Sequence, residues 1–172
     1  MHMFIDIMHV LFTYKRHMTI VYAVPRPYCQ EFITECFRTF ETVSILYDCT
    51  DDNLNIVLER YINPLLKLVS ETLHRDVALE YIITYDNKIE KSMVTPIHYI
   101  MKSKRWYTMK KMNMVVVTPN VHLCRKHKNF LYIPPCDDIE IDRELLESCT
   151  KLDDVSMWYK TYKTVRTFPH FA

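Results

Sequence analysis

The sequence predicts a single α+β domain over residues 1–172, with a mostly antiparallel sheet packed against a long central helix. Its length of 172 residues and its apolar content of 49% suit one hydrophobic core. Helical and extended patterns alternate along the chain, and one helical pattern is much longer than the others. A tight turn between two extended stretches indicates a hairpin, so neighbouring strands are expected to run antiparallel.

The N-terminal segment predicts a helix followed by a strand. Apolar residues between positions 4 and 12 recur at helical spacing, and Lys15 and Arg16 are basic residues that suit the C-terminal end of a helix. The stretch from Thr19 to Val24 is rich in β-branched residues, which favours a strand. Pro25 is expected to end this strand because proline cannot donate a hydrogen bond to a sheet.

A short helix, a strand and the longest helix are expected next. Residues 32–40 place their apolar side chains on one helical face, whereas residues 42–47 are β-branched and aromatic enough for a strand. Thr50 supplies a capping hydroxyl for the long helix, whose apolar residues between positions 54 and 73 form two adjacent stripes. Such a wide apolar surface predicts deep burial, and Pro64 predicts a kink.

The C-terminal half predicts mostly strands. Apolar residues alternate from Val77 to Tyr85, Asp86-Asn87 suits a turn, and residues 88–94 return as the second strand of a hairpin. The remaining expected elements are strands at residues 97–101, 112–118, 131–133 and 157–165, and a helix or helical turn at residues 143–149.

Composition argues against several classes of function. The chain contains no glycine, whereas the P-loop, the dinucleotide fingerprint and the nucleophile elbow all need glycine where backbone meets phosphate or turns sharply. The 22 basic and 21 acidic residues nearly cancel, so charge provides no overall attraction to nucleic acid or anionic lipid. No apolar run approaches the roughly 18 residues of a membrane span, and no secretory signal pattern opens the chain. A cytoplasmic protein without a cofactor is therefore expected.

Cysteine and histidine spacing leaves one metal question open. The six cysteines include no C-x-x-C pair, and in a reducing compartment they are interpreted as buried or free thiols. No metal site is predicted, because the spacing of the soft ligands fits no standard zinc module. The sequence leaves open whether His122, Cys124, His127 and Cys136 bind a metal.

The candidate site is a basic segment with two embedded aromatic residues. The densest run of positive charge covers residues 102–111 and contains Lys104, Arg105, Trp106 and Tyr107. Exposed tryptophan and tyrosine are typical anchors of protein interfaces, which indicates a docking finger; a solvated hairpin tip explains the pattern equally well. No motif nominates a nucleophile with its base, so no catalytic residue is expected and the protein is predicted not to be an enzyme.

The order of these elements, together with several short stretches, resembles the HORMA family. Within that family the chain is most similar to the small HORMA subunits of autophagy-initiation kinase complexes. The stretches that carry the resemblance are Met8–Phe12 with Lys15-Arg16, Thr42–Leu54, Ile97–Trp106, Leu131–Pro135 and Asp154–Lys160.

This resemblance implies a non-enzymatic scaffold in autophagosome assembly. Such a subunit pairs with the larger HORMA subunit of the complex, stabilises it and recruits downstream factors through a finger around Trp106, in the cytoplasm or at the phagophore assembly site. One alternative is a peptide-trapping HORMA adaptor of the spindle-checkpoint or translesion type. Another is a small nucleic-acid-binding protein that uses the basic residues at 102–111 and 125–128.

Overall fold

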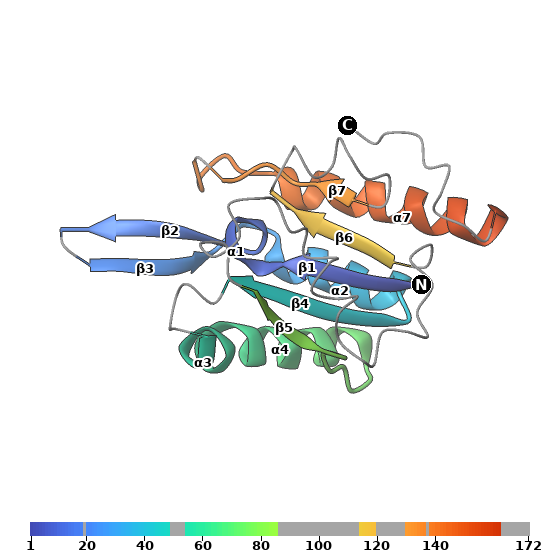
Figure 1. The fold of residues 1–172 in the computed structure, drawn as a ribbon, viewed down its shortest axis with the longest axis horizontal. Coiled ribbons are helices and arrows are strands. Elements are labelled where there is room, and N and C mark those ends of the chain that lie inside the picture. The colour runs from blue at the N-terminus through green and yellow to red at the C-terminus, as the bar shows by residue number, and fades with distance from the viewer. Residues whose placement is uncertain (19, 49–53, 86–113, 120–129, 137, 163–172) are drawn as a thin grey trace.

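The fold is a parallel sheet with helices on one face and a β-hairpin that projects from one end (Figure 1). It is seen in a computed structural model. The residues that the structure describes are 1–18, 20–48, 54–85, 114–119, 130–136 and 138–162. The strands are β1 (His2–Asp6), β2 (Phe12–His17), β3 (Ile20–Pro25), β4 (Thr42–Asp48), β5 (Ile82–Tyr85), β6 (Met114–Thr118) and β7 (Phe130–Tyr132). The helical elements are α1 (Ile7–Val10), α2 (Cys29–Thr39), α3 (Leu54–Val57), the π-helical turn η1 (Leu58–Ile62), α4 (Asn63–Leu73) and α7 (Glu144–Tyr162).

Five strands form the main sheet in the order β5-β4-β1-β6-β7, and every neighbouring pair is parallel. Counted along the chain within this sheet, the order is 3-2-1-4-5, which is the strand order of a doubly wound α/β sheet. The chain adds strands on one side of β1 and then changes to the other side with β6. β2 and β3 form a separate antiparallel pair.

The core lies between the sheet and a layer of three helices. α2 packs between α4 and α7, behind the sheet in Figure 1. Alternate residues of β1, such as Met3 and Ile5, belong to the same cluster of buried side chains as Phe32 of α2 and Leu152 of α7. Phe4, which points to the opposite face of the sheet, is also fully buried. β1 is therefore covered on both faces, as central parallel strands usually are.

The prediction of a mostly antiparallel sheet is wrong. β5 pairs with β4 in parallel, although residues 77–94 were expected to form a hairpin. The returning strand at 88–94 and the expected strand at 97–101 lie outside the described residues. Only the small β2–β3 pair is antiparallel among the described strands. The HORMA-like arrangement, which was inferred from the order of elements and from short sequence stretches, stays a prediction without support from this topology.

The expected first helix is a strand. Residues 2–6 form β1, and α1 is only a turn, because Met8 is extended and His9 has a left-handed φ of 63°. An apolar run that is buried on both faces of a sheet shows no alternation, so its spacing matches a helix as well as a strand. The chain then enters β2, a strand that the sequence did not indicate.

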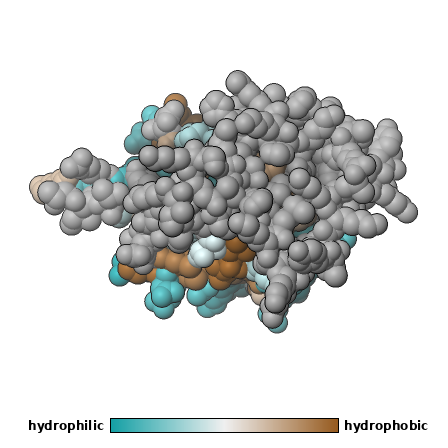
Figure 2. Space-filling model, viewed as in Figure 1, coloured by the Kyte–Doolittle hydropathy of each residue, from teal (hydrophilic) through white to brown (hydrophobic). Residues whose placement is uncertain are grey.

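The long helical pattern is confirmed between Leu54 and Leu73, but its expected deep burial is wrong. The helix lies at one side of the helical layer, and α2 takes the central place. Leu68 remains 46% exposed, and Figure 2 shows apolar surface gathered where α3 to α4 lies in Figure 1. The irregularity expected at Pro64 occurs just before it, as the π-helical turn η1.

Of the remaining predicted elements, some are confirmed and one is wrong. The expected strands near residues 20, 42 and 114 are confirmed as β3, β4 and β6, and the helix near residue 32 is confirmed as α2. The strand predicted at 157–165 is wrong up to Tyr162, because α7 continues through this stretch. Leu145, Leu152 and Val155, at helical spacing, are buried apolar residues that pack α7 against the core.

Candidate functional site

The carboxyl ends of the parallel strands meet at one edge of the sheet. β1 ends at Asp6, β4 at Asp48 and β6 at Thr118. In open α/β sheets, ligands bind outside the carboxyl ends of the strands, at the point where strand order reverses. Here that point lies between β1 and β6. The hairpin β2–β3 and the beginnings of α2 and of the α3–α4 segment all follow strands that end at this edge.

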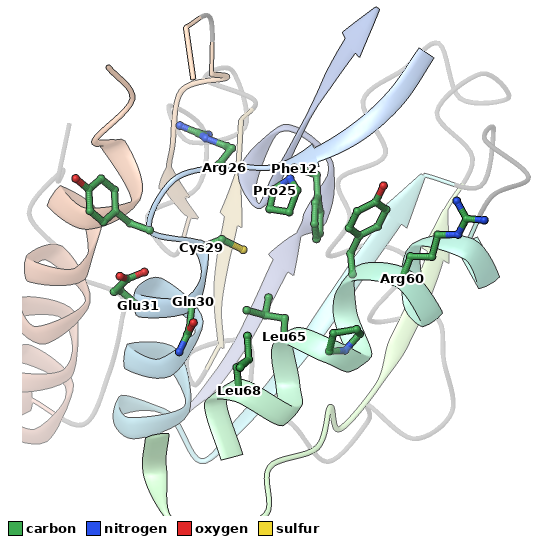
Figure 3. Close-up of a pocket in the computed structure, with 12 residues that line it drawn as sticks. Phe12, Pro25, Arg26, Cys29, Gln30, Glu31, Arg60, Leu65 and Leu68 are labelled. Atoms are coloured by element: carbon green, nitrogen blue, oxygen red, sulfur yellow. The ribbon is translucent and has the colours of Figure 1, made fainter. Parts of the chain in front are cut away.

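A groove of about 360 Å³ opens between these elements. Its residues come from the base of the hairpin, from the first turn of α2 and from η1 with α4 (Figure 3). This volume lies at the small end of the range of ligand pockets, roughly 300–1,000 Å³. The groove residues are Phe12, Pro25, Arg26, Tyr28, Cys29, Gln30, Glu31, Arg60, Tyr61, Pro64, Leu65 and Leu68.

Aromatic and aliphatic side chains form the walls of the groove. The ring centroids of Phe12 and Tyr61 are 5.3 Å apart at an interplanar angle of 54°, a distance at which aromatic rings attract each other. This contact joins the hairpin base to η1. Leu65 and Leu68 project from α4 toward the space between α4 and α2 (Figure 3). An apolar wall with few polar groups is typical of a site that buries an apolar ligand group.

The two exposed charged side chains of the groove, Arg60 and Glu31, lie on different elements. Arg60 is exposed at the η1 end. Glu31 is exposed on α2, but in Figure 3 it lies on the side of α7. Its charge acts on the thiol of Cys149, a residue of α7, and helps to raise the pKa of that thiol to about 11, after the larger effect of burial. After burial, the charge of Glu31 also helps to raise the pKa of Cys29, a groove residue, so Glu31 supplies negative charge on α2 while Arg60 supplies positive charge on η1.

Arg26 is a buried connector. Its Nε and Nη2 donate to the two carboxylate oxygens of Asp142 at 2.7 and 2.9 Å, and its Nη1 donates to the carbonyls of His9 and Pro134 at 2.7 and 2.8 Å. Its side chain has no exposed surface, and that of Asp142 is 4% exposed. Burial raises the pKa of Asp142, but hydrogen bonds, first of all from Arg26, outweigh it and hold the pKa below its ordinary value. Arg26 thus fixes the turn after β1 to the segment before α7.

Asp6 and Thr118 mark the point where strand order reverses. The Asp6 side chain is buried, and Thr118 Oγ1 donates to Asp6 Oδ2 at 3.4 Å. The turn after Asp6 contains His9 in its left-handed conformation, a conformation that costs a non-glycine residue about 1 kcal/mol or more. Strained backbone of this kind often accompanies ligand sites. Burial and then the nearby charge of Arg26 lower the pKa of His9, which favours the neutral imidazole.

The cysteines near the groove are not activated nucleophiles. Burial raises the pKa of Cys29 to about 12 and that of Cys36 well above its ordinary value. A thiol reacts as its thiolate, so both remain protonated at neutral pH. Within the described part of the chain, no group of three or more His, Cys, Asp or Glu residues is placed to hold a metal ion.

The sequence-based candidate site and this edge of the sheet do not coincide. Lys104, Arg105, Trp106 and Tyr107 lie outside the described residues, as do His122, Cys124 and His127; Cys136 is described and half-buried. Sequence reasoning missed the groove and Asp6. Asp6 had one available signal, because an acidic residue directly after an apolar run is typical of the end of a buried strand. The groove had none, since its walls are far apart in the sequence.

No model of a known protein family matches the chain, and no curated protein sequence matches it either. Among the described helices, none combines the length and the apolar character needed to cross a membrane.

Proposed function

We propose that the chain is a non-enzymatic protein-binding domain that holds an extended segment of a partner protein in the groove. The observation that carries this proposal is the apolar, partly aromatic wall of the groove at the carboxyl edge of the sheet. An aliphatic or aromatic side chain of the partner would enter between Tyr61 and Leu65, and the rest of the segment would lie across the exposed side of α4. Partner residues of this kind are the usual anchors of protein interfaces.

Exposed apolar surface on the α3–α4 segment supports the same proposal. Ile56 and Leu68 are each 46% exposed. Figure 2 shows apolar surface gathered over this segment, and such a patch commonly marks a binding site. The finer expectation is that the chain pairs with the larger HORMA subunit of an autophagy-initiation complex and recruits downstream factors through a finger around Trp106. It remains a proposal that rests on the sequence resemblance alone.

Selection from a random peptide library displayed on phage tests the groove. Peptides selected on the wild-type chain should contain an aromatic or aliphatic anchor and should bind the Leu68→Glu variant at least tenfold more weakly, because a carboxylate would stand in the apolar wall. The matched control is Lys67→Glu, which introduces the same side chain at the adjacent exposed position outside the groove. Equal binding to wild type and Leu68→Glu would contradict the proposal.

Asp6 favours a second candidate function, which is phosphoryl transfer. An aspartate at the point where the strand order of a parallel sheet reverses occupies the usual ligand position, and carboxylates serve as nucleophiles toward phosphorus in some enzymes. One carboxylate oxygen would attack phosphorus, the ester oxygen would leave and take a proton from water, and a second water would hydrolyse the acyl phosphate. The test is release of p-nitrophenol from p-nitrophenyl phosphate with Mg²⁺. Activity that is absent, or unchanged in Asp6→Asn, rejects this candidate.

A further inference from the structure

Within the described residues, two charged residues of the groove have no internal ion pair, and the positive one, Arg60, lies on η1, the element that contacts the hairpin base through Tyr61. Three groove residues carry a formal charge: Arg26, Glu31 and Arg60. Arg26 is neutralised by Asp142, which lies outside the groove. Glu31 lies on the side of α7. Arg60 is exposed, and no ion pair within the described part of the chain involves it. A ligand at the η1 end of the groove therefore meets the positive charge of Arg60, whereas the negative charge of Glu31 lies on α2.

The β2–β3 hairpin, which adjoins the groove, is positively charged, as Arg60 is. Phe12 and Pro25, which are cross-strand partners at its base, are groove residues. From residue 12 to residue 30 the sequence contains no Asp or Glu, whereas Lys15, Arg16 and His17 follow one another in β2. Lys15 and His17 are exposed, and the hairpin projects away from the rest of the fold in Figure 1. A chain that leaves the groove along the hairpin thus passes basic groups and no acidic ones.

We infer that the partner segment is acidic, with carboxylates beside its apolar anchor that pair with Arg60 and with the basic hairpin. This inference rests on the proposed protein-binding function and adds the chemistry of the partner. Arg60 offers a planar set of donors that can bind a carboxylate with two hydrogen bonds. Lys15 and His17 are two residues apart in one strand, so their side chains share a face and are spaced by roughly 7 Å. Carboxylates two residues apart on an extended segment have the same spacing.

A protein segment is favoured over nucleic acid by the form of the site. The groove accepts a side chain between apolar walls, whereas binding to a phosphate backbone is carried by many cations. The chain as a whole has a formal charge of only +1, so it has little general attraction for a polyanion. An acidic peptide with an apolar anchor satisfies both the wall and the local charge.

Three synthetic heptapeptides provide the test. Each has a central tryptophan; the flanking residues are aspartates in the acidic peptide, lysines in the basic peptide and serines in the neutral peptide. Titration into the ¹⁵N-labelled wild-type chain, followed by NMR, should show the acidic peptide binding about tenfold more tightly than the basic one, because each of two exposed pairs contributes a factor of about three. The preference should shrink in 0.5 M NaCl because the charges are exposed.

Charge reversal identifies the residues responsible. Arg60→Glu and Lys15→Glu should each remove most of the preference for the acidic peptide, because each replaces an attractive pair worth about threefold with a repulsive one. Lys67→Glu, an exposed reversal on α4 outside the groove, should leave the preference unchanged. Folding of each variant is checked by its NMR spectrum before titration, and all three positions are exposed, so folding should persist.

The outcomes separate this inference from the proposed function. If all three peptides bind equally and the Leu68→Glu variant binds none of them, the groove binds protein segments but the inferred preference for acidic segments is wrong. If none binds, the proposed function itself fails. If a fifteen-nucleotide oligothymidylate binds more tightly than the acidic peptide and binding survives Leu68→Glu, the basic surface serves nucleic acid and the inference is rejected.

Discussion

Removing the charge of Asp142 should destabilise the protein by about 3 kcal/mol. The Asp142→Asn variant would leave the guanidinium of Arg26 buried without its carboxylate, and breaking a buried ion pair from one side costs about 3–5 kcal/mol. The lower value applies because the asparagine carbonyl still accepts one hydrogen bond. Small domains have unfolding free energies of about 5–15 kcal/mol, so this single change would remove a large share of the stability.

Urea unfolding at pH 7, followed by circular dichroism, measures the effect. With a slope of about 1–3 kcal/mol per molar urea, the midpoint should fall by about 1 M or more. The same chain offers a matched control in the pair of Arg38 and Glu35, whose side chains are 58% and 15% exposed. Glu35→Gln should cost less than about 1 kcal/mol because the Arg38 end of that pair is well exposed to solvent. If Asp142→Asn costs no more than Glu35→Gln, Arg26 is not the buried connector described above.

Three further predictions concern left-handed backbone, pH and thiols. His74 follows α4 with φ of 51°, so His74→Gly should raise the unfolding free energy by about 0.5–1 kcal/mol; no gain in urea unfolding would contradict this reading of the helix end. The lowered pKa of His9 means that the unfolded chain binds more protons, so stability should be full above about pH 6.5 and fall as the pH drops through the folded-state pKa. His9→Asn should flatten that decline in unfolding midpoints measured from pH 8 to 5, and an unchanged slope would count against it. Cys29 and Cys36 should resist a water-soluble disulfide reagent at pH 8 in the folded state and react after denaturation, as mass spectrometry of the labelled peptides would show; rapid native labelling would disprove their burial.

Local patterns predicted those elements whose burial is one-sided. α2 has six buried residues on one face and an exposed Arg38 on the other, so its helical spacing is visible in the sequence. The strand β1 was wrongly predicted as a helix because Met3, Phe4 and Ile5 are all buried. A strand that is covered on both faces loses the alternation that identifies it in a sequence. The parallel direction of the sheet was also missed, because the predicted direction depended on the expected hairpin at 77–94.

The candidate site depends on contacts that no local pattern encodes. Phe12 and Tyr61 meet across 49 positions of sequence, and Arg26 reaches Asp142 over 116 positions. Arginine near proline in a sequence usually indicates a surface loop, yet Arg26 is one of the largest fully buried side chains among the described residues. Composition contributed one lasting constraint: without glycine, left-handed positions are taken by Tyr28 and other larger residues among those described.

The anchoring of Arg26 has a consequence for the speed and tightness of recognition. Because this groove residue is fastened through four hydrogen bonds to the turn after β1, the segment before α7 and Asp142, its side of the groove is preorganised before any partner arrives. A preorganised surface loses little conformational entropy on binding, so most of the ordering cost would fall on the incoming segment. Competing segments should then differ mainly in how long they stay bound, with similar association rates.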